Sequence, residues 1–176
     1  MAFTTIAVLG LGNVGHLAAE LLTNAGFEVT GFDSRPISDA PFSVRQADLA
    51  DAAALLTALD GQEAVLSCLP YAFNEAVASA AHALGAHYFD LTEDVATSRH
   101  ICALAESAKG VMAPQCGLAP GFVAIVGAYL AHKFERVRSI RLRVGALPQH
   151  PTGMLGYAFN RSPEGVVNEY LNDCEV

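Results

Sequence analysis

A glycine-rich turn between an apolar run and a helix is the feature that most restricts how this chain can fold. Residues 5–9 (TIAVL) are apolar and β-branched, and Gly10-Leu-Gly-Asn-Val-Gly15 follows at once. Leucines then recur at helical spacing, and a second apolar run ends at Asp33. The order strand, glycine turn, helix, strand and acid predicts a βαβ unit that binds a dinucleotide.

Each glycine of this turn has its own physical reason. Gly10 permits the tight turn, Gly12 lets the backbone approach a pyrophosphate, and Gly15 allows the helix to pack closely on the sheet. The pyrophosphate is expected at the N-terminus of the helix, where unpaired N–H groups and the helix dipole favour negative charge. The expected binding residues here are Gly10, Gly12, Asn13, Val14 and Gly15.

The residues after the second strand bear on the choice of cofactor. Asp33 is placed to accept hydrogen bonds from an adenosine ribose and to repel a 2′-phosphate, which favours NAD over NADP. Arg35 can pair with a 2′-phosphate or stack on adenine, or it is a solvated loop charge, so NADP stays possible. Ser34 is included in the expected site. Asp48 either contacts adenine or, as the simpler alternative, is the N-cap of a helix at 49–59.

Strand and helix patterns continue to alternate after this unit. Strands are predicted at 5–9, 27–32, 43–47, 64–69, 87–91 and 110–113, and helices at 16–25, 49–59, 73–84 and 94–107. This order predicts an α/β chain with a Rossmann-type doubly wound parallel sheet. Cys68, Leu69 and Pro70 end the fourth strand at the carboxyl edge, where we expect backbone contact with the nicotinamide ribose.

The pattern changes after the sixth strand. A helix is predicted from Gly121 to about Lys133, and residues 137–147 then alternate between charged and apolar side chains, as in a half-exposed strand of another sheet. A short helix is predicted at 163–171. We therefore expect a cofactor-binding domain at 1–122 and the beginning of a second α+β domain at 123–176. A lone strand and helix cannot bury a core, which favours a longer polypeptide over packing against another copy.

Composition excludes several classes of partner. The chain carries 10 Lys and Arg against 18 Asp and Glu, a net charge of −8, so a nucleic-acid partner is not expected. Apolar runs are too short for a membrane helix. The four cysteines form no Cys-x-x-Cys pair and the histidines have no metal-ligand spacing, which predicts a cytoplasmic protein without a metal site. The 52% apolar content favours a homodimer or higher homo-oligomer.

Four segments carry a resemblance to a known family. GLGNVG, CLPYAFN, YFDLTED and QCGLAPGF, in this order, resemble the saccharopine dehydrogenase family, and the nearer resemblance is to its lysine 6-dehydrogenase-like members. Ala119 stands where saccharopine-forming members carry an acid. The resemblance implies NAD(P)-dependent oxidation of an amine carbon of an amino acid, with hydride transfer to nicotinamide and hydrolysis or cyclisation of the imine.

The resemblance also implies roles for single residues. Tyr71 matches a tyrosine that faces the nicotinamide, as proton donor or substrate partner, with an interface aromatic as the alternative. Asp90 and Glu93, at the end of the fifth strand, would bind a substrate ammonium, unless Glu93 caps the next helix. Cys116 and Gly117 would lie along the nicotinamide, with Cys116 as a small packing residue rather than a nucleophile.

The sequence leaves open which residues hold the substrate carboxylate and whether the protein is an enzyme. Arg141, Arg143 and His150 are candidates for holding the substrate carboxylate, although solvated strand charge explains the two arginines better. The second hypothesis of function is a non-catalytic module that senses NAD(H), and a homologue without activity is a third. A sensor does not need Tyr71, Asp90 and Glu93 near the nicotinamide.

Overall fold

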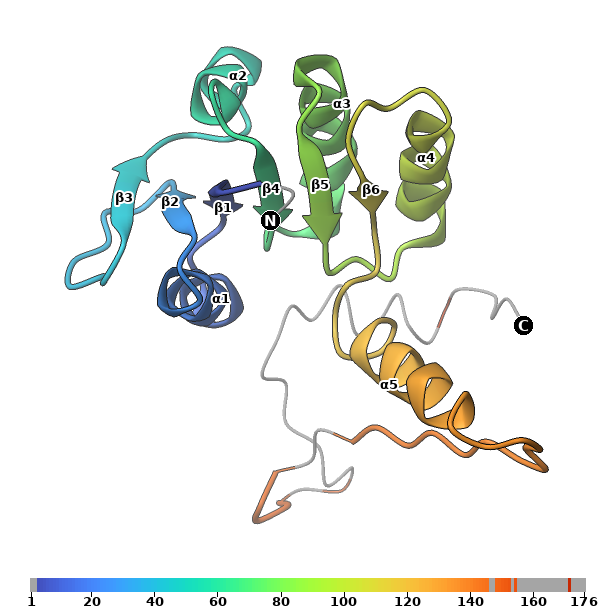
Figure 1. The fold of residues 1–176 in the computed structure, drawn as a ribbon. Helices are drawn as coiled ribbons and strands as arrows, with labels where there is room; N and C mark the ends of the chain where they lie inside the picture. The colour runs from blue at the N-terminus through green and yellow to red at the C-terminus, as the bar shows by residue number, and fades with distance from the viewer. Residues whose placement is uncertain (1–2, 146–147, 153, 155–170, 172–176) are drawn as a thin grey trace. The chain divides into compact units, whose positions relative to one another are not determined.

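The computed structural model describes residues 3–145, 148–152, 154 and 171 (Figure 1). The chain divides into two compact units, Met1–Cys116 and Gly117–Val176. Each unit is described by itself.

A six-stranded parallel sheet forms the centre of the first unit. Its order is β3-β2-β1-β4-β5-β6, so the chain moves outward from β1 in one direction and from β4 in the other. The strands are β1 (Thr5–Leu9), β2 (Glu28–Asp33), β3 (Ser43–Gln46), β4 (Ala64–Ser67), β5 (His87–Asp90) and β6 (Met112–Ala113). The strand order reverses between β1 and β4, which confirms the predicted doubly wound Rossmann fold.

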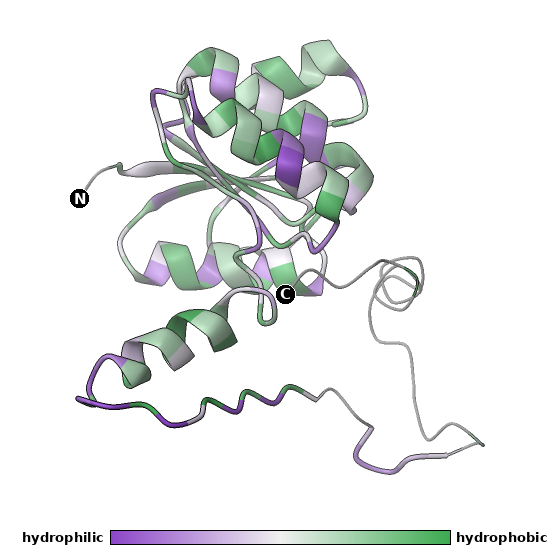
Figure 2. Ribbon diagram, turned by 90° about the vertical axis from the view of Figure 1, so that its right-hand side faces the viewer, coloured by the Kyte–Doolittle hydropathy of each residue, from purple (hydrophilic) through white to green (hydrophobic). Residues whose placement is uncertain are grey.

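Helices cover both faces of this sheet (Figures 1 and 2). Helix α1 packs on one face, and α2, α3 and α4 pack side by side on the other. Their bounds are α1 (Asn13–Asn24), α2 (Ala52–Leu59), α3 (Asn74–Leu84) and α4 (Val95–Ala105). A short 3-10 turn, η1 (Tyr71–Phe73), precedes α3. This arrangement explains why the central strands β1 and β4 are apolar on both sides.

Alternate residues of β1 supply the two cores. Ala7 and Leu9 point into the core under α2, α3 and α4, whereas Ile6 and Val8 point into the core under α1. The first core also contains Leu55, Leu59, Val65, Val77, Tyr88 and Ile101. Because strand side chains alternate between faces, the short run TIAVL buries both sides of the sheet at its centre.

The start of α2 differs from the prediction. The N-cap of α2 is Asp51, whose carboxylate accepts the Ala54 N–H at 3.0 Å. The simpler interpretation of Asp48, as the N-cap of this helix, is therefore wrong. Asp48 instead accepts the Ala50 N–H at 3.1 Å in the preceding turn. Both acids precede the same apolar helix. Asp51 is the cap because it lies three residues before Ala54, whose N–H is in the first turn and needs an acceptor from outside the helix backbone.

Two other helix starts also shift. Helix α1 begins at Asn13, within the glycine turn, rather than at His16. Helix α4 begins at Val95, and its N-cap is Asp94, whose carboxylate accepts the Thr97 N–H at 2.8 Å. The alternative that Glu93 caps this helix is therefore wrong.

Glu63 holds the beginning of β1 in place at the amino-terminal edge of the sheet. Its Oε2 accepts the Thr4 N–H at 2.6 Å, the Thr4 hydroxyl at 2.9 Å and the Thr5 N–H at 3.1 Å. The backbone and hydroxyl donors of Thr4 and Thr5 lower the pKa of Glu63 to about 2. The residue before β4 thus holds the first residues of β1 in place.

The second unit contains helix α5 (Phe122–Ala131) and an extended segment. Residues 137–145 form no strand, so the predicted strand is wrong over these residues, although apolar and charged side chains alternate along them (Figure 2). A strand needs a partner for its backbone hydrogen bonds, and the described residues offer it none. A Cβ at Gly127 would lie 2.9 Å from Cδ2 of Leu142, so this glycine gives Leu142 room beside α5.

The structure describes only some of the other residues for which predictions were made in the second unit. Arg141, Arg143 and His150 are exposed. The end of the strand prediction at 146–147 and almost all of the helix predicted at 163–171 lie outside the described residues. Within the described ranges, no helix is both long enough and apolar enough to cross a bilayer.

Candidate cofactor site

The glycine turn lies at the point where the strand order reverses. The Gly10 N–H donates to the Phe32 carbonyl of β2 at 2.8 Å, and the Cys68 N–H donates to the Leu9 carbonyl of β1 at 2.8 Å. The turn is thus tied to the strands on both sides of β1. In open α/β sheets, ligands bind at this carboxyl edge, beside the point of reversal.

Gly10 and Gly15 are glycines because the turn is crowded. Gly10 has φ +85°, and a Cβ there would lie 2.9 Å from Cδ2 of Leu69 and 3.1 Å from the Cys68 carbonyl oxygen. Gly15 is buried on the inner side of α1, where a Cβ would run into the Gly10 carbonyl oxygen. The prediction that Gly15 allows close packing of helix and sheet agrees with this contact.

Gly12 has the opposite environment. Its φ is −70°, and in the described part of the chain nothing lies within 4 Å of where its Cβ would be. It is the N-cap of α1, and no side chain caps the helix there. Asn13 and Val14 follow it and are exposed. The first N–H groups of α1 therefore face open space, which suits a phosphate.

Asp33 ends β2 and faces the turn. Its Oδ2 accepts the Leu11 N–H at 2.8 Å, and its Oδ1 accepts the Arg35 N–H at 2.9 Å and Nε at 3.1 Å. Burial alone would raise the pKa of Asp33, but the hydrogen bonds from Arg35 and Leu11 outweigh it and hold this pKa below its usual range. The carboxylate is therefore ionised and already engaged on both oxygens.

Arg35 is mostly in solvent. Its side chain is 68% exposed, compared with 9% for Asp33, so the guanidinium covers the acid from outside. Ser34 is exposed between them, and its carbonyl accepts Nε2 of Gln46 from the end of β3 at 2.9 Å. Asp48 follows β3 at the same edge of the sheet and is exposed.

Residues after β4 line the other side of the turn. The Cys68 side chain is packed against the turn, 3.1 Å from where a Gly15 Cβ would be, and burial raises the pKa of its thiol to about 12. Cys68 is therefore a neutral packing group. Leu69 and Pro70 lead into η1, and Tyr71 is 39% exposed.

Asp90 is in a very different environment from Asp33. It is fully buried, and it accepts the Tyr88 hydroxyl at 2.8 Å and the N–H groups of Thr92 and Gln115 at 3.0 Å each. Burial raises the pKa of Asp90, although these hydrogen bonds oppose the shift. Burial also raises the pKa of Tyr88, and the Asp90 charge adds to that. Asp90 therefore lies below the protein surface at the carboxyl edge of the sheet.

The remaining candidates lie around Asp90 or in the second unit. Cys116 is exposed as a residue and its Sγ lies 3.4 Å from the Ala113 carbonyl oxygen. Partial burial of the thiol, together with the Asp90 charge, raises its pKa. Glu93 is half-buried in the segment after β5. Gly117 belongs to the second unit, where its carbonyl accepts the Phe122 N–H at 2.8 Å.

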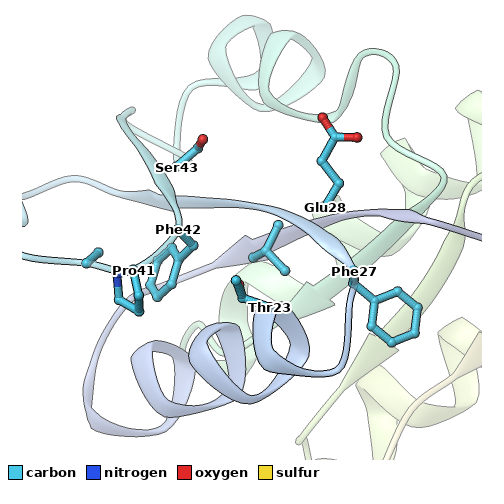
Figure 3. Close-up of a pocket in the computed structure, with 8 residues that line it drawn as sticks. Thr23, Phe27, Glu28, Pro41, Phe42 and Ser43 are labelled. Carbon is cyan, nitrogen blue, oxygen red and sulfur yellow. The ribbon is translucent and has the colours of Figure 1, made fainter.

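A cavity of about 550 Å³ lies at the opposite edge of the sheet (Figure 3). It is formed where α1 ends and where β2 and β3 begin, and Phe27, Glu28 and Phe42 are among its lining residues. It contains none of the residues predicted for the cofactor. Across the described ranges, no three His, Cys, Asp or Glu side chains gather as a metal site would need.

The sequence interpretation missed several residues that shape this edge. Leu11 supplies the N–H that holds Asp33, and Ser67, Asn74, Tyr88 and Gln115 surround Asp90. Tyr88 was detectable, because it lies two residues before Asp90 and therefore on the same face of β5. Gln115 carried no such signal, because its contact spans 25 residues of chain.

The comparisons with known proteins agree with this geometry. The family model described as the saccharopine dehydrogenase NADP binding domain matches residues 6–113, which is more than half of the chain. The chain belongs to the saccharopine dehydrogenase family. This confirms the resemblance predicted from the sequence motifs and indicates a nicotinamide cofactor, whereas the nearer likeness to lysine 6-dehydrogenases stays a prediction.

Solved structures support the fold of this saccharopine dehydrogenase family member. It matches apo saccharopine dehydrogenase (L-Glu forming) from Saccharomyces cerevisiae with TM-score 0.65 and 20% identity, over 93% of this chain and 40% of that one. It matches MoeE5 in complex with UDP-glucuronic acid and NAD with TM-score 0.50 and 18% identity, over 61% and 52% of the two chains. The chain thus spans well under half of the yeast enzyme.

Proposed function

We propose that this chain is the cofactor-binding part of an NAD(P)-dependent oxidoreductase that acts on the CH–NH or CH–NH2 group of an amino acid. The observation that carries the proposal is the glycine turn. Gly10 and Gly15 are fixed by crowding, but among the described residues nothing lies within 4 Å of where a Gly12 Cβ would be, so crowding does not explain this glycine. A close approach of an anionic ligand to α1 explains a glycine at this position.

For the cofactor itself we propose NAD, with NADP also admitted. Asp33 at the end of β2 supports NAD, because an ionised carboxylate accepts ribose hydroxyls and repels a 2′-phosphate. Arg35 supports the admission of NADP, because its guanidinium is mostly exposed beside Asp33 and its N–H groups suit a phosphate.

We assign the chemistry to the residues at the ends of β4 and β5. The bound dinucleotide supplies the hydride acceptor. Tyr71 is exposed after β4, and its phenol is proposed to hold or donate a proton at the substrate nitrogen. Glu93 is proposed to pair with the substrate ammonium, as its carboxylate charge suits a cation. The lysine 6-dehydrogenase-like likeness makes lysine-like amines the first substrates to try.

Gly12→Val tests the proposal. A valine at this position adds a branched side chain where the pyrophosphate would lie, and its Cβ has no atom of the described residues within 4 Å, apart from its chain neighbours. The variant should fold, with a cost of about 1 kcal/mol from the poorer N-cap, and should lose NADH and NADPH binding in a fluorescence titration. Gly145→Val is the matched control, because a Cβ there likewise has no contact within 4 Å in the described part of the chain, and it should bind as the wild type does.

The outcomes separate the possibilities. Wild-type affinity in a folded Gly12→Val variant would refute the placement of the pyrophosphate. Binding of NADH by the wild type, followed by cofactor reduction when NAD and a lysine-like amine are mixed with the chain, would support the dehydrogenase. Binding that never leads to turnover with any amine tried, in a full-length protein that retains Tyr71 and Glu93, would favour the sensing module.

A further inference from the structure

Asp90 joins the two loops that leave β5 and β6. Its Oδ1 accepts the N–H of Thr92 and of Gln115, each at 3.0 Å. Its main-chain carbonyl accepts the N–H of Cys116 at 2.8 Å. Two consecutive amides after β6 are therefore held by one residue, once through its side chain and once through its backbone.

The carboxylate is itself held in place from behind. Its Oδ2 accepts the Tyr88 hydroxyl at 2.8 Å, and that hydroxyl lies 3.5 Å from the Asn74 carbonyl. The Asn74 side chain in turn accepts the Ser67 hydroxyl at 2.7 Å. Ser67, Asn74, Tyr88 and Asp90 are all almost completely buried. This network spans the ends of β4 and β5 and the start of α3, so Asp90 cannot turn without breaking it.

The loop that Asp90 holds has an unfavourable backbone conformation. Gln115 has φ +63°, in the left-handed region that a residue with a Cβ rarely adopts, and its side chain is exposed. Such conformations persist where surrounding structure fixes them, and they are frequent at ligand sites. The bonds from the Gln115 and Cys116 N–H groups to Asp90 hold this turn.

The place of the loop gives it a function. In a doubly wound sheet, β1 to β3 hold the adenosine half of a dinucleotide and β4 to β6 hold the other half. We infer that Asp90 is a positioning residue for the nicotinamide half of the cofactor site: it fixes the backbone of Gln115 and Cys116 and does not touch the ligand. The inference rests on the proposed function and replaces the predicted contact between Asp90 and a substrate ammonium, because the carboxylate is fully buried and engaged on both oxygens.

Two substitutions of Asp90 distinguish its role in positioning the loop from an effect of its negative charge. Asp90→Ala removes the acceptor for Thr92 and Gln115 and lets the loop relax. Asp90→Asn keeps a carbonyl oxygen for those two N–H groups, and its amide donates to the Tyr88 hydroxyl, which can then donate to Asn74. The geometry therefore survives without the negative charge, so Asp90→Asn should restore what Asp90→Ala loses.

The experiment is a calorimetric titration of the 176-residue chain with NADH and, separately, with ADP. ADP reaches only the adenosine half of the site, whereas NADH reaches both halves. Asp90→Ala should weaken NADH binding about tenfold, since the N–H groups of Thr92 and Gln115 lose their acceptor and the loop is no longer held, and should change ADP binding by less than about twofold. Asp90→Asn should bind both ligands within about twofold of the wild type.

Glu63→Ala is the control for general destabilisation. Glu63 also holds backbone N–H groups, but at the amino-terminal edge of the sheet, so its loss should leave the ratio of NADH to ADP affinity unchanged. Equal weakening of ADP and NADH in Asp90→Ala would overturn the inference, as would an Asp90→Asn variant as weak as Asp90→Ala. A wild type that binds neither ligand would instead refute the proposed function, and the inference with it.

Discussion

Arg35→Ala is predicted to shift the cofactor preference toward NADH and away from NADPH. A carboxylate offers about four acceptor positions. On Asp33, the N–H groups of Leu11 and Arg35 take two of them, and the Arg35 guanidinium takes the others with Nε at 3.1 Å and Nη2 at 3.5 Å. The two hydroxyls of an adenosine ribose therefore compete with the guanidinium. Removal of the Arg35 side chain leaves two positions for them.

The two effects differ in size. The Arg35 side chain is 68% exposed, and solvent screens an exposed ion pair so that it contributes little, so its loss should tighten NADH binding by no more than about fivefold. A 2′-phosphate loses a charged hydrogen-bond donor, so NADPH binding should weaken about tenfold to a hundredfold. The change in preference is therefore dominated by NADPH.

Parallel fluorescence titrations with NADH and NADPH at low and high salt measure both effects. Lys109→Ala is the matched control, because it removes one exposed positive charge before β6, at the opposite edge of the sheet. Asp33→Ala should act in the other direction and narrow the gap between the two cofactors. Unchanged NADPH affinity in Arg35→Ala would refute the idea that the guanidinium reaches a 2′-phosphate.

Two further predictions concern stability. Gly15→Ala would force a Cβ against the Gly10 carbonyl, so the free energy of unfolding should fall by about 3 kcal/mol and the melting temperature by roughly 10 °C in a thermal scan; a wild-type melting temperature would contradict the contact. The pKa of Glu63 is lowered to about 2 from 4.5, so its bonds to Thr4 and Thr5 stabilise the fold above pH 4.5 and are lost as the pH falls toward 2. Glu63→Gln should remove this dependence in acid unfolding curves, and equal slopes for both proteins would exclude it.

The fold was predictable because its signals are local. The glycine turn, the apolar runs and the helix-ending glycines each lie within a few residues, and the sheet order follows from the alternation of strands and helices. The strand predicted at 137–147 shows the limit of such signals. Its alternating pattern describes a surface with one apolar face, but strand formation also needs a neighbouring backbone, which the pattern cannot reveal.

The candidate site was predictable in its first half and only partly in its second. Gly10, Gly12, Gly15 and Asp33 follow one another within a single βαβ unit, so spacing alone relates them. The contacts after β4 and β5 join residues far apart in the chain, such as Asp90 and Gln115. Sequence spacing gives no reason to connect those two.

Asp33 and Asp90 occupy similar positions in the sequence, but their neighbouring residues give the two carboxylates different environments. Each is the last residue of a parallel strand at the same edge of the sheet. Asp33 has an arginine two residues later, so its charge is compensated, its pKa is lowered, and it stays close enough to solvent to meet a ligand. Asp90 has Tyr88 two residues earlier, its described donors are neutral, and burial raises its pKa. The same residue type is therefore proposed to bind the cofactor in one half of the site and to shape the backbone in the other.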